Sequence, residues 1–143
     1  MKRTKNIRKN KFQPGDFKTK VGRSTAGLGL FAVDEIPKGK CIIEYVGRTI
    51  SAAEEYTINS KYLFEIHSRM TIDGKPRHNR AGYINHSCRP NAEPEVRKHR
   101  VFIMAKRAIK PSEEILYDYG KEYWKEYIGP DKCRCEKCVE KRK

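Results

Sequence analysis

The side chains with the widest chemical range in this sequence stand together in the run Asn-His-Ser-Cys at residues 85–88. All four residue types take part in hydrogen bonds, and histidine and cysteine also bind metals. Pro90 follows and keeps the residue before it out of helix, so the run ends in a turn. Such a segment is suited to contacting a ligand. A polar loop with a local Asx-type turn would explain it equally well.

A second group consists of Cys133, Cys135 and Cys138. A structural zinc ion takes four ligands in a tetrahedron, so a fourth must come from elsewhere in the chain. Cys88 is the natural candidate and a histidine is a competitor, whereas Cys41 lies in an apolar run and is expected to be a buried small side chain. The alternative is a set of free or redox-active thiols. Because the chain has five cysteines, an odd number, we expect no disulfide framework and an intracellular, reducing compartment.

A third pattern is Tyr-Asp-Tyr at residues 117–119. In a strand, Tyr117 and Tyr119 face one side and Asp118 faces the other. Two phenols on one face could line a narrow channel, and the alternative is an ordinary pair of strand aromatics.

Gly27 and Gly29 form the fourth pattern, in Thr-Ala-Gly-Leu-Gly-Leu-Phe. Glycines spaced in this way let the backbone approach a ligand or another strand closely. A dinucleotide fingerprint would need a following helix, and here Phe31-Ala-Val continues as a strand. The alternative is a β-bulge or tight turn.

The elements that must position these residues are mostly β. Short apolar alternations broken by turns predict strands at 17–23, 28–33, 40–46, 62–67, 70–73, 92–97, 100–105 and 115–119. Ser51 and Glu54 form a capping box that predicts a short helix from about Ala52 to Ile58. Residues 121–127 are expected to form two helical turns.

One spacing occurs twice in the chain. The residues Ala32, Ile36, Gly39 and Ile42 are spaced in the same way as Ala105, Ile109, Ser112 and Ile115. Two similar turn-then-strand units explain this repeat.

The charge is concentrated at the two ends. The 143 residues, enough for one domain, carry 32 Lys and Arg against 18 Asp and Glu, a net charge of +14. We expect residues 1–16 to be a flexible basic arm, and we expect the termini to contact a polyanion such as nucleic acid without sequence specificity. Basic tails that only maintain solubility are the alternative. No apolar run is long enough to cross a bilayer, and no secretory signal begins the chain.

Taken together, the motifs resemble the SET-domain protein-lysine methyltransferases, in order and approximate spacing, from Thr19 to Cys138. The resemblance implies a mostly β fold of small antiparallel sheets with a C-terminal pseudoknot and one or two short helices. It also implies a SET domain over residues 17–127 and a post-SET zinc segment with a basic tail over residues 128–143.

The resemblance further implies S-adenosylmethionine as methyl donor and one structural zinc ion. Three site residues would line the lysine channel and act in catalysis: Tyr45, Tyr117 and Tyr119. The cofactor would contact Ala26, Gly27, Leu28, Tyr62, Asn85, His86 and Trp124. The zinc ligands would be Cys88, Cys133, Cys135 and Cys138. Because Tyr117 stands where the family has Phe or Tyr, and a phenol there can hold a water that crowds the amine, we expect mainly monomethylation or dimethylation.

The sequence departs from the family pattern at a few points. Gly82 stands where many members have Arg, Ser112 replaces a usual Gly, and the last two cysteines are separated by two residues where four is more usual. The insert between Gly47 and Tyr62 is short, which predicts an open and less selective peptide groove.

The expected substrate is a histone tail or another basic, nucleic-acid-associated protein, including a ribosomal one. We expect a monomer, with a dimer as the alternative, in the nucleus of a eukaryote or the cytoplasm of a prokaryote. A catalytically weak SET-like zinc module that binds nucleic acid or chromatin is the competing reading.

Overall fold

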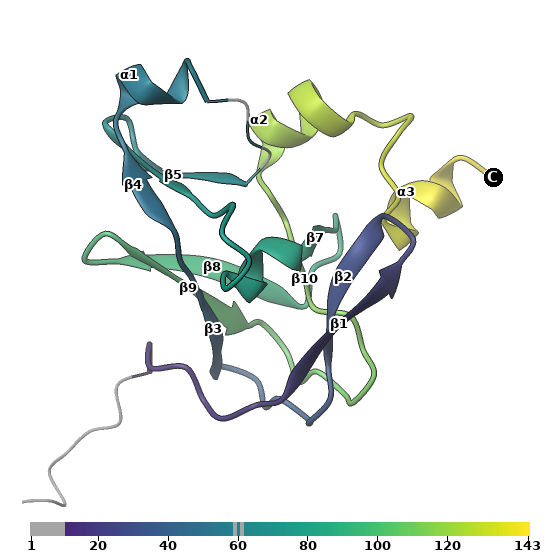
Figure 1. The fold of residues 1–143 in the computed structure, drawn as a ribbon. Helices are drawn as coiled ribbons and strands as arrows, with labels where there is room; N and C mark the ends of the chain where they lie inside the picture. The colour runs from purple at the N-terminus through teal and green to yellow at the C-terminus, as the bar shows by residue number, and fades with distance from the viewer. Residues whose placement is uncertain (1–10, 59, 61) are drawn as a thin grey trace, which may run out of the picture.

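The computed structural model describes residues 11–58, 60 and 62–143, and Figure 1 shows their arrangement. Ten short strands alternate with turns and a few short helices. The strands are β1 (Thr19–Ser24), β2 (Gly27–Ala32), β3 (Cys41–Tyr45), β4 (Arg48–Ile50), β5 (Leu63–His67), β6 (Met70–Asp73), β7 (Asn85–His86), β8 (Ala92–Arg97), β9 (Arg100–Ala105) and β10 (Leu116–Tyr117). The helices are α1 (Ala52–Glu55), the 3₁₀-helix η2 (Arg80–Tyr83), α2 (Lys121–Tyr123), the π-helix η3 (Trp124–Ile128) and α3 (Glu136–Lys141).

Four small sheets make up the β structure: β1-β2, β3-β9-β8, β4-β6-β5 and the parallel pair β7-β10. Figure 1 shows β7 and β10 between the β4-β6-β5 sheet and the β1-β2 hairpin. In the parallel pair, Asn85 lies opposite Leu116 and His86 lies opposite Tyr117. The predicted mostly β fold of small sheets is confirmed, and β7-β10 joins the middle of the chain to its C-terminal part.

Strand β9 separates two apolar clusters because its side chains alternate between faces. Val101, Ile103 and Ala105 belong to the main core. Phe102 and Met104 face the other way, where Phe12 and Cys41 cover them.

Residues 11–16, which were predicted to belong to a flexible basic arm, contact the body of the domain. Phe12 is only 8% exposed, and its ring centroid lies 5.6 Å from that of Phe102. The backbone N–H of Gly15 donates to the carbonyl of Cys41 at 3.0 Å. Apolar surface on the outer face of β9 therefore holds residues 11–16 against the body. Residues 1–10 lie outside the described part of the chain.

The repeated spacing corresponds to two turn units that pair with each other. Ile36 and Ile109 exchange backbone hydrogen bonds at 2.9 and 2.8 Å. Two equivalent bonds flank them, from Gly39 N–H to the Ala105 carbonyl and from Ser112 N–H to the Ala32 carbonyl, both at 2.8 Å. The contacts are related by a local twofold axis.

Gly39 and Ser112 occupy equivalent places in the two units, and both have positive φ, at 85° and 75°. Glycine adopts a positive φ most readily, so the serine at position 112 is less suited to this backbone than the glycine that is usual in the family.

The capping box at Ser51 and Glu54 is present, although the helix that it starts ends at Glu55 rather than Ile58. Residues 121–127 are helical, but they form one α-turn followed by a π-turn. No helix among the described residues is long and apolar enough to span a membrane.

Candidate active site

A cavity of about 850 Å³ opens between β2, β5, η2, β10 and the helical segment after Gly120. Its size suits a small-molecule ligand. Eight of the ten residues predicted for catalysis or cofactor binding line it: Ala26, Gly27, Leu28, Tyr45, Tyr62, Asn85, Tyr117 and Tyr119. His86 and Trp124 do not line it, and their positions are described below.

The hydroxyl groups of Tyr45 and Tyr119 are oriented by backbone carbonyls. Tyr45 Oη donates to the carbonyl of Tyr62 at 2.6 Å. Tyr119 Oη donates to the carbonyl of Ile84 in a short hydrogen bond. Because each phenol has used its single proton, its oxygen is left as an acceptor.

Burial raises the pKa of Tyr45, Tyr117 and Tyr119, and neighbouring tyrosines raise it further. These phenols are therefore protonated at neutral pH and cannot serve there as bases. The Tyr117 ring lies 5.0 Å from that of Tyr119. Tyr117 is only 6% exposed and lines the cavity beside Tyr119.

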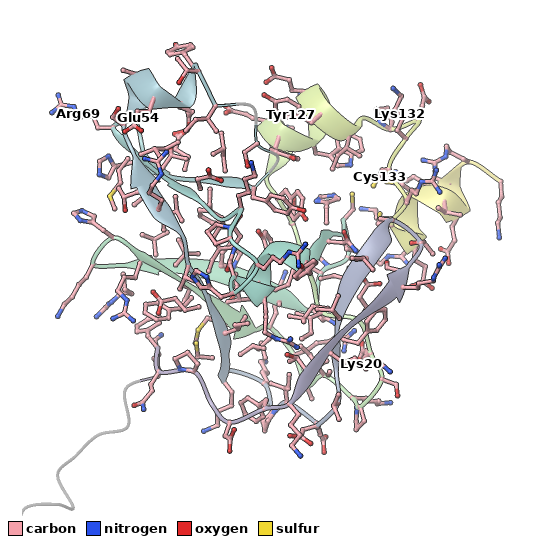
Figure 2. The ribbon with its side chains drawn as sticks, in the orientation of Figure 1. Lys20, Glu54, Arg69, Tyr127, Lys132 and Cys133 are labelled. Atoms are coloured by element: carbon pink, nitrogen blue, oxygen red, sulfur yellow. The ribbon has the colours of Figure 1, made fainter. Side chains whose placement is uncertain are left out.

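An aromatic series leads from this buried pair to the surface. The ring centroids of Tyr119 and Tyr123 are 5.3 Å apart, and those of Tyr123 and Tyr127 are 4.8 Å apart. Tyr127 is 66% exposed, and Figure 2 labels it on the segment above the sheets. Sequence reasoning assigned no site role to Tyr123 and Tyr127. Their four-residue spacing from Tyr119, which places helical residues on one face, was the available signal.

Among the described residues, three glutamates also line the cavity, Glu65, Glu122 and Glu126, together with one lysine, Lys121. The sequence analysis did not identify these residues. They make this opening locally acidic in a chain whose net charge is +14.

The glycine-rich turn between β1 and β2 presents its backbone to the cavity. Gly27 has φ of 101°, and a Cβ added there would meet nothing within 4 Å. The carbonyl of Leu28 accepts from Asn85 Nδ2 at 2.9 Å, which holds the turn against β7.

Glu114 supports this turn from behind. Its carboxylate accepts from Ser24 Oγ at 2.8 Å and from Asn85 Nδ2 at 2.9 Å. A Cβ at Gly29 would lie 2.4 Å from Glu114 Oε2, so the absence of a side chain there lets the carboxylate approach. No role for Glu114 was predicted from the sequence.

His86 lies between Tyr119 and Cys88. Its Nδ1 accepts from the backbone N–H of Tyr119 at 3.0 Å, so the ring proton is on Nε2, which lies 3.3 Å from Cys88 Sγ. Burial lowers the pKa of His86 against the opposing effect of Asp118, which agrees with a neutral ring.

The four cysteines predicted as metal ligands come together. The sulfur atoms of Cys88, Cys133, Cys135 and Cys138 all lie within 4.8 Å of one another. A tetrahedral zinc site with Zn–S near 2.3 Å places its sulfurs about 3.8 Å apart. The distance between Cys88 and Cys138 Sγ, 3.7 Å, fits this spacing. Cys41 is buried in a separate cluster, where burial raises its pKa to about 11.

Trp124 packs against this cysteine cluster with Ile128. Its indole nitrogen is buried and has no hydrogen-bond partner within the described residues. The helical segment thus joins the cluster, labelled at Cys133 in Figure 2, to the aromatic wall of the cavity.

Comparison with known proteins agrees with this arrangement. The family model of the SET domain matches residues 27–120. The histone-lysine N-methyltransferase ASHH1 of Arabidopsis thaliana is 35% identical over 140 residues, which is 87% of this chain and 28% of the relative. The histone-lysine N-methyltransferase set-2 of Caenorhabditis elegans is 40% identical over 106 residues, 65% of this chain and 7% of the relative. An H3 lysine-4 specific histone-lysine N-methyltransferase of Schizosaccharomyces pombe is 36% identical over 105 residues, 64% of this chain and 11% of the relative.

The chain therefore spans less than a third of the length of these relatives. The match to the family model nevertheless covers most of the chain. It includes Gly27 and Gly29, the two residues of β7, and Tyr117 and Tyr119. This chain belongs to the SET-domain family.

Proposed function

We propose that this chain transfers methyl groups from S-adenosylmethionine to lysine side chains of protein substrates. One observation carries the proposal: two phenol oxygens, on Tyr45 and Tyr119, face a largely aromatic cavity as acceptors because backbone carbonyls take their protons.

These acceptors suit an amine. A free lysine has a pKa near 10.4 and is charged at neutral pH, where it is not a nucleophile. A cavity walled by buried tyrosines disfavours the ammonium form and so favours the neutral amine. Tyr45 and Tyr119 would accept its N–H groups and hold its lone pair in one direction. Since the phenols stay protonated, the lysine proton must leave to water.

When bound, S-adenosylmethionine supplies an electrophilic methyl group. We propose that the backbone of residues 26–28, with Tyr62 and Asn85, holds this cofactor, because these residues share one cavity. His86 would act by orienting the Tyr119 backbone. The buried Trp124 N–H requires an acceptor, which a bound cofactor or a thiolate would provide.

The hydroxyl of Tyr117 supports a limit on the number of methyl groups that each lysine receives. The Tyr117 side chain is buried beside Tyr119 and lines the same cavity. A water held there would crowd an amine that already carries a methyl group, so we propose mainly monomethylation or dimethylation.

The four-cysteine cluster is proposed to hold one zinc ion. Its role would be structural, since it fixes residues 133–138 to Cys88 beside the active site. We accordingly propose that residues 17–127 form the catalytic domain and residues 128–143 a post-SET segment.

The proposed substrate is a basic protein such as a histone tail, as the names of the relatives suggest. The carboxylates of Glu65, Glu122 and Glu126 at the cavity support this, because they offer acidic contacts to basic residues next to the target lysine. Such a substrate would place the enzyme in the nucleus if the source is a eukaryote and in the cytoplasm if it is a prokaryote. We further propose that basic segments near the termini contact nucleic acid and that the chain acts as a monomer.

The test is transfer of labelled methyl groups to histones and to whole-cell protein. We expect labelled lysine with the wild-type chain and a loss of at least about 100-fold with Tyr119→Phe, since one positioned group is removed from the reaction centre. Full activity of Tyr119→Phe would remove the role assigned to Tyr119. No lysine methylation of any protein by a zinc-loaded, folded chain would overturn the proposal.

A further inference from the structure

Basic side chains gather around the turn between β8 and β9. Four of them, residues 97–100, are consecutive, and the fifth, Lys11, comes from the N-terminal segment. We call the five residues the hairpin surface: Lys11, Arg97, Lys98, His99 and Arg100. All five are exposed, and none lines the cavity. In Figure 1 the hairpin projects on the side of the molecule away from α3.

Two aromatic rings in contact, Phe12 and Phe102, hold three of these cations in place. Lys11 Nζ lies 4.9 Å and Arg97 Cζ 4.8 Å from the centroid of Phe12. Arg100 Cζ lies 5.1 Å from the centroid of Phe102, which packs on Phe12. Because a stacked guanidinium still has free N–H groups at its edge, the rings orient the cations without neutralising them.

The turn itself is strained. Lys98 and His99 have φ of 50° and 63°, the conformation of a type I′ turn, in which Asn-Gly is preferred. A Lys-His pair at these positions costs stability. Strained backbone with an unsuitable residue type is a reason to look for a function in the side chains.

The positive charge is also largely unpaired. Within the described part of the chain, Arg100 is the one member of the hairpin surface with a carboxylate within 4.0 Å, that of Glu44. The ten residues before Lys11 add five basic residues and no acidic one to the sequence. Phe12 holds Lys11, the first described residue, beside the hairpin.

We propose that the hairpin surface binds the phosphate backbone of duplex DNA without reading its sequence. Oriented cations from two separate segments, of which Lys11 and Arg97 have no carboxylate within 4.0 Å among the described residues, match a polyanion with regularly spaced charges. Within the described part of this surface, Phe12 and Phe102 are both buried, so neither ring is available for insertion into a lipid surface. The choice of DNA rests on the proposed function, because histones are bound to DNA. The surface would hold the enzyme near its substrate while the cavity remains open.

The test measures DNA binding separately from catalysis. The double variant Lys98→Asn with His99→Gly removes one charge and installs the preferred turn pair, so the fold is expected to be at least as stable. Lys38→Asn removes one charge from an exposed turn outside the surface and is the matched control. Binding of a short, labelled, mixed-sequence duplex is followed by fluorescence anisotropy at several salt concentrations, and methylation of a free histone peptide is measured in parallel.

We expect the double variant to bind the duplex roughly fivefold to tenfold more weakly at 0.1 M salt and to lower the salt slope by about 1. Its peptide methylation should equal that of the wild type. An affinity loss no larger than that of Lys38→Asn would overturn the proposal. Preference for an RNA duplex or for phosphatidylserine vesicles over DNA would overturn the choice of partner. A chain that binds DNA through this surface but methylates nothing would contradict the proposed function alone.

Discussion

Asn85 donates a hydrogen bond from Nδ2 to Oε2 of Glu114 at 2.9 Å, although the two residues are 29 positions apart. The same Nδ2 group donates to the Leu28 carbonyl, and Glu114 accepts a second bond from Ser24. One carboxylate therefore joins both sides of the glycine-rich turn to β7. This makes Glu114 a positioning residue for the proposed cofactor site.

Glu114→Gln should weaken cofactor binding with little change in the maximal rate. The glutamine side chain has one oxygen, which can accept the hydrogen bond from either Ser24 or Asn85. Its NH₂ group would then face the other donor. Loss of a hydrogen bond to a charged group costs about 1.5 to 3 kcal/mol, so the KM for S-adenosylmethionine should rise roughly 10-fold or more. Glu113→Gln is the control, because Glu113 pairs with Arg107 on the surface. An unchanged KM in Glu114→Gln would show that the turn is held by other contacts.

Tyr117→Phe should increase the number of methyl groups that each lysine receives. The change removes the buried hydroxyl and leaves the packing of the ring with Tyr119 intact. Mass spectrometry of a peptide substrate should show a shift from monomethyllysine or dimethyllysine towards the next state. Tyr123→Phe, further along the aromatic series, should not cause this shift. If the wild type already makes trimethyllysine readily, the hydroxyl has no such role.

Cys88→Ser should release the proposed metal ion. Elemental analysis of the purified wild type should give about one zinc per chain, since the four thiols form one site. The variant should hold far less and unfold at a lower temperature. Cys41→Ala tests specificity, because Cys41 lies in a separate cluster and its loss should leave the zinc content unchanged. Equal zinc in Cys88→Ser and the wild type would exclude Cys88 as a ligand.

Ser112→Gly should stabilise the chain by about 0.5 to 1 kcal/mol, because a positive φ strains any residue with a Cβ. Gly39→Ser, at the equivalent place in the other turn unit, should destabilise it by a similar amount. The added Cβ at Gly39 meets nothing within 4 Å, so the effect arises from the backbone conformation. Denaturant unfolding of both variants checks the two signs. A destabilising Ser112→Gly would mean that the serine side chain has a role of its own.

Phe12→Ala should lower the free energy of unfolding by about 3 kcal/mol, the usual cost of removing a buried aromatic ring. The change would expose Phe102 and Met104 on the outer face of β9. Phe12→Leu, which preserves apolar cover, should cost less than about 1.5 kcal/mol. Urea unfolding measures both, and equal stability of Phe12→Ala and the wild type would show that the segment does not contribute to the fold.

The sequence predicted those elements whose signals are local. Strands β8 and β9 have the predicted bounds, because alternating side chains flank a tight turn. The cap at Ser51 follows from residue types three positions apart. In contrast, β7 and β10 have two residues each, too few for any periodicity, and their pairing depends on tertiary structure.

The same distinction applies to the site. The tyrosines and cysteines were identified from their motifs, but Phe12 was missed, since one aromatic in a charged segment has no periodic signal. Glu113 and Glu114 look alike in the sequence, yet they form different contacts, with Arg107 and with Asn85. Both lie before β10, and Glu114 alone forms an isolated β-bridge, with Phe31, which no local pattern in the sequence indicates.

The paired turn units have a consequence for how such a chain can accept insertions. The hydrogen bonds between Ile36 and Ile109 close a loop that contains the segment between β4 and β5. Because that segment contributes no hydrogen bond to this closure, residues added there would leave the distance in space between Gly27 and Tyr119 unchanged. Each doubling of a loop costs only about 0.6 kcal/mol in closure entropy. The segment between β4 and β5 can therefore differ in length while the paired turn units keep their hydrogen bonds.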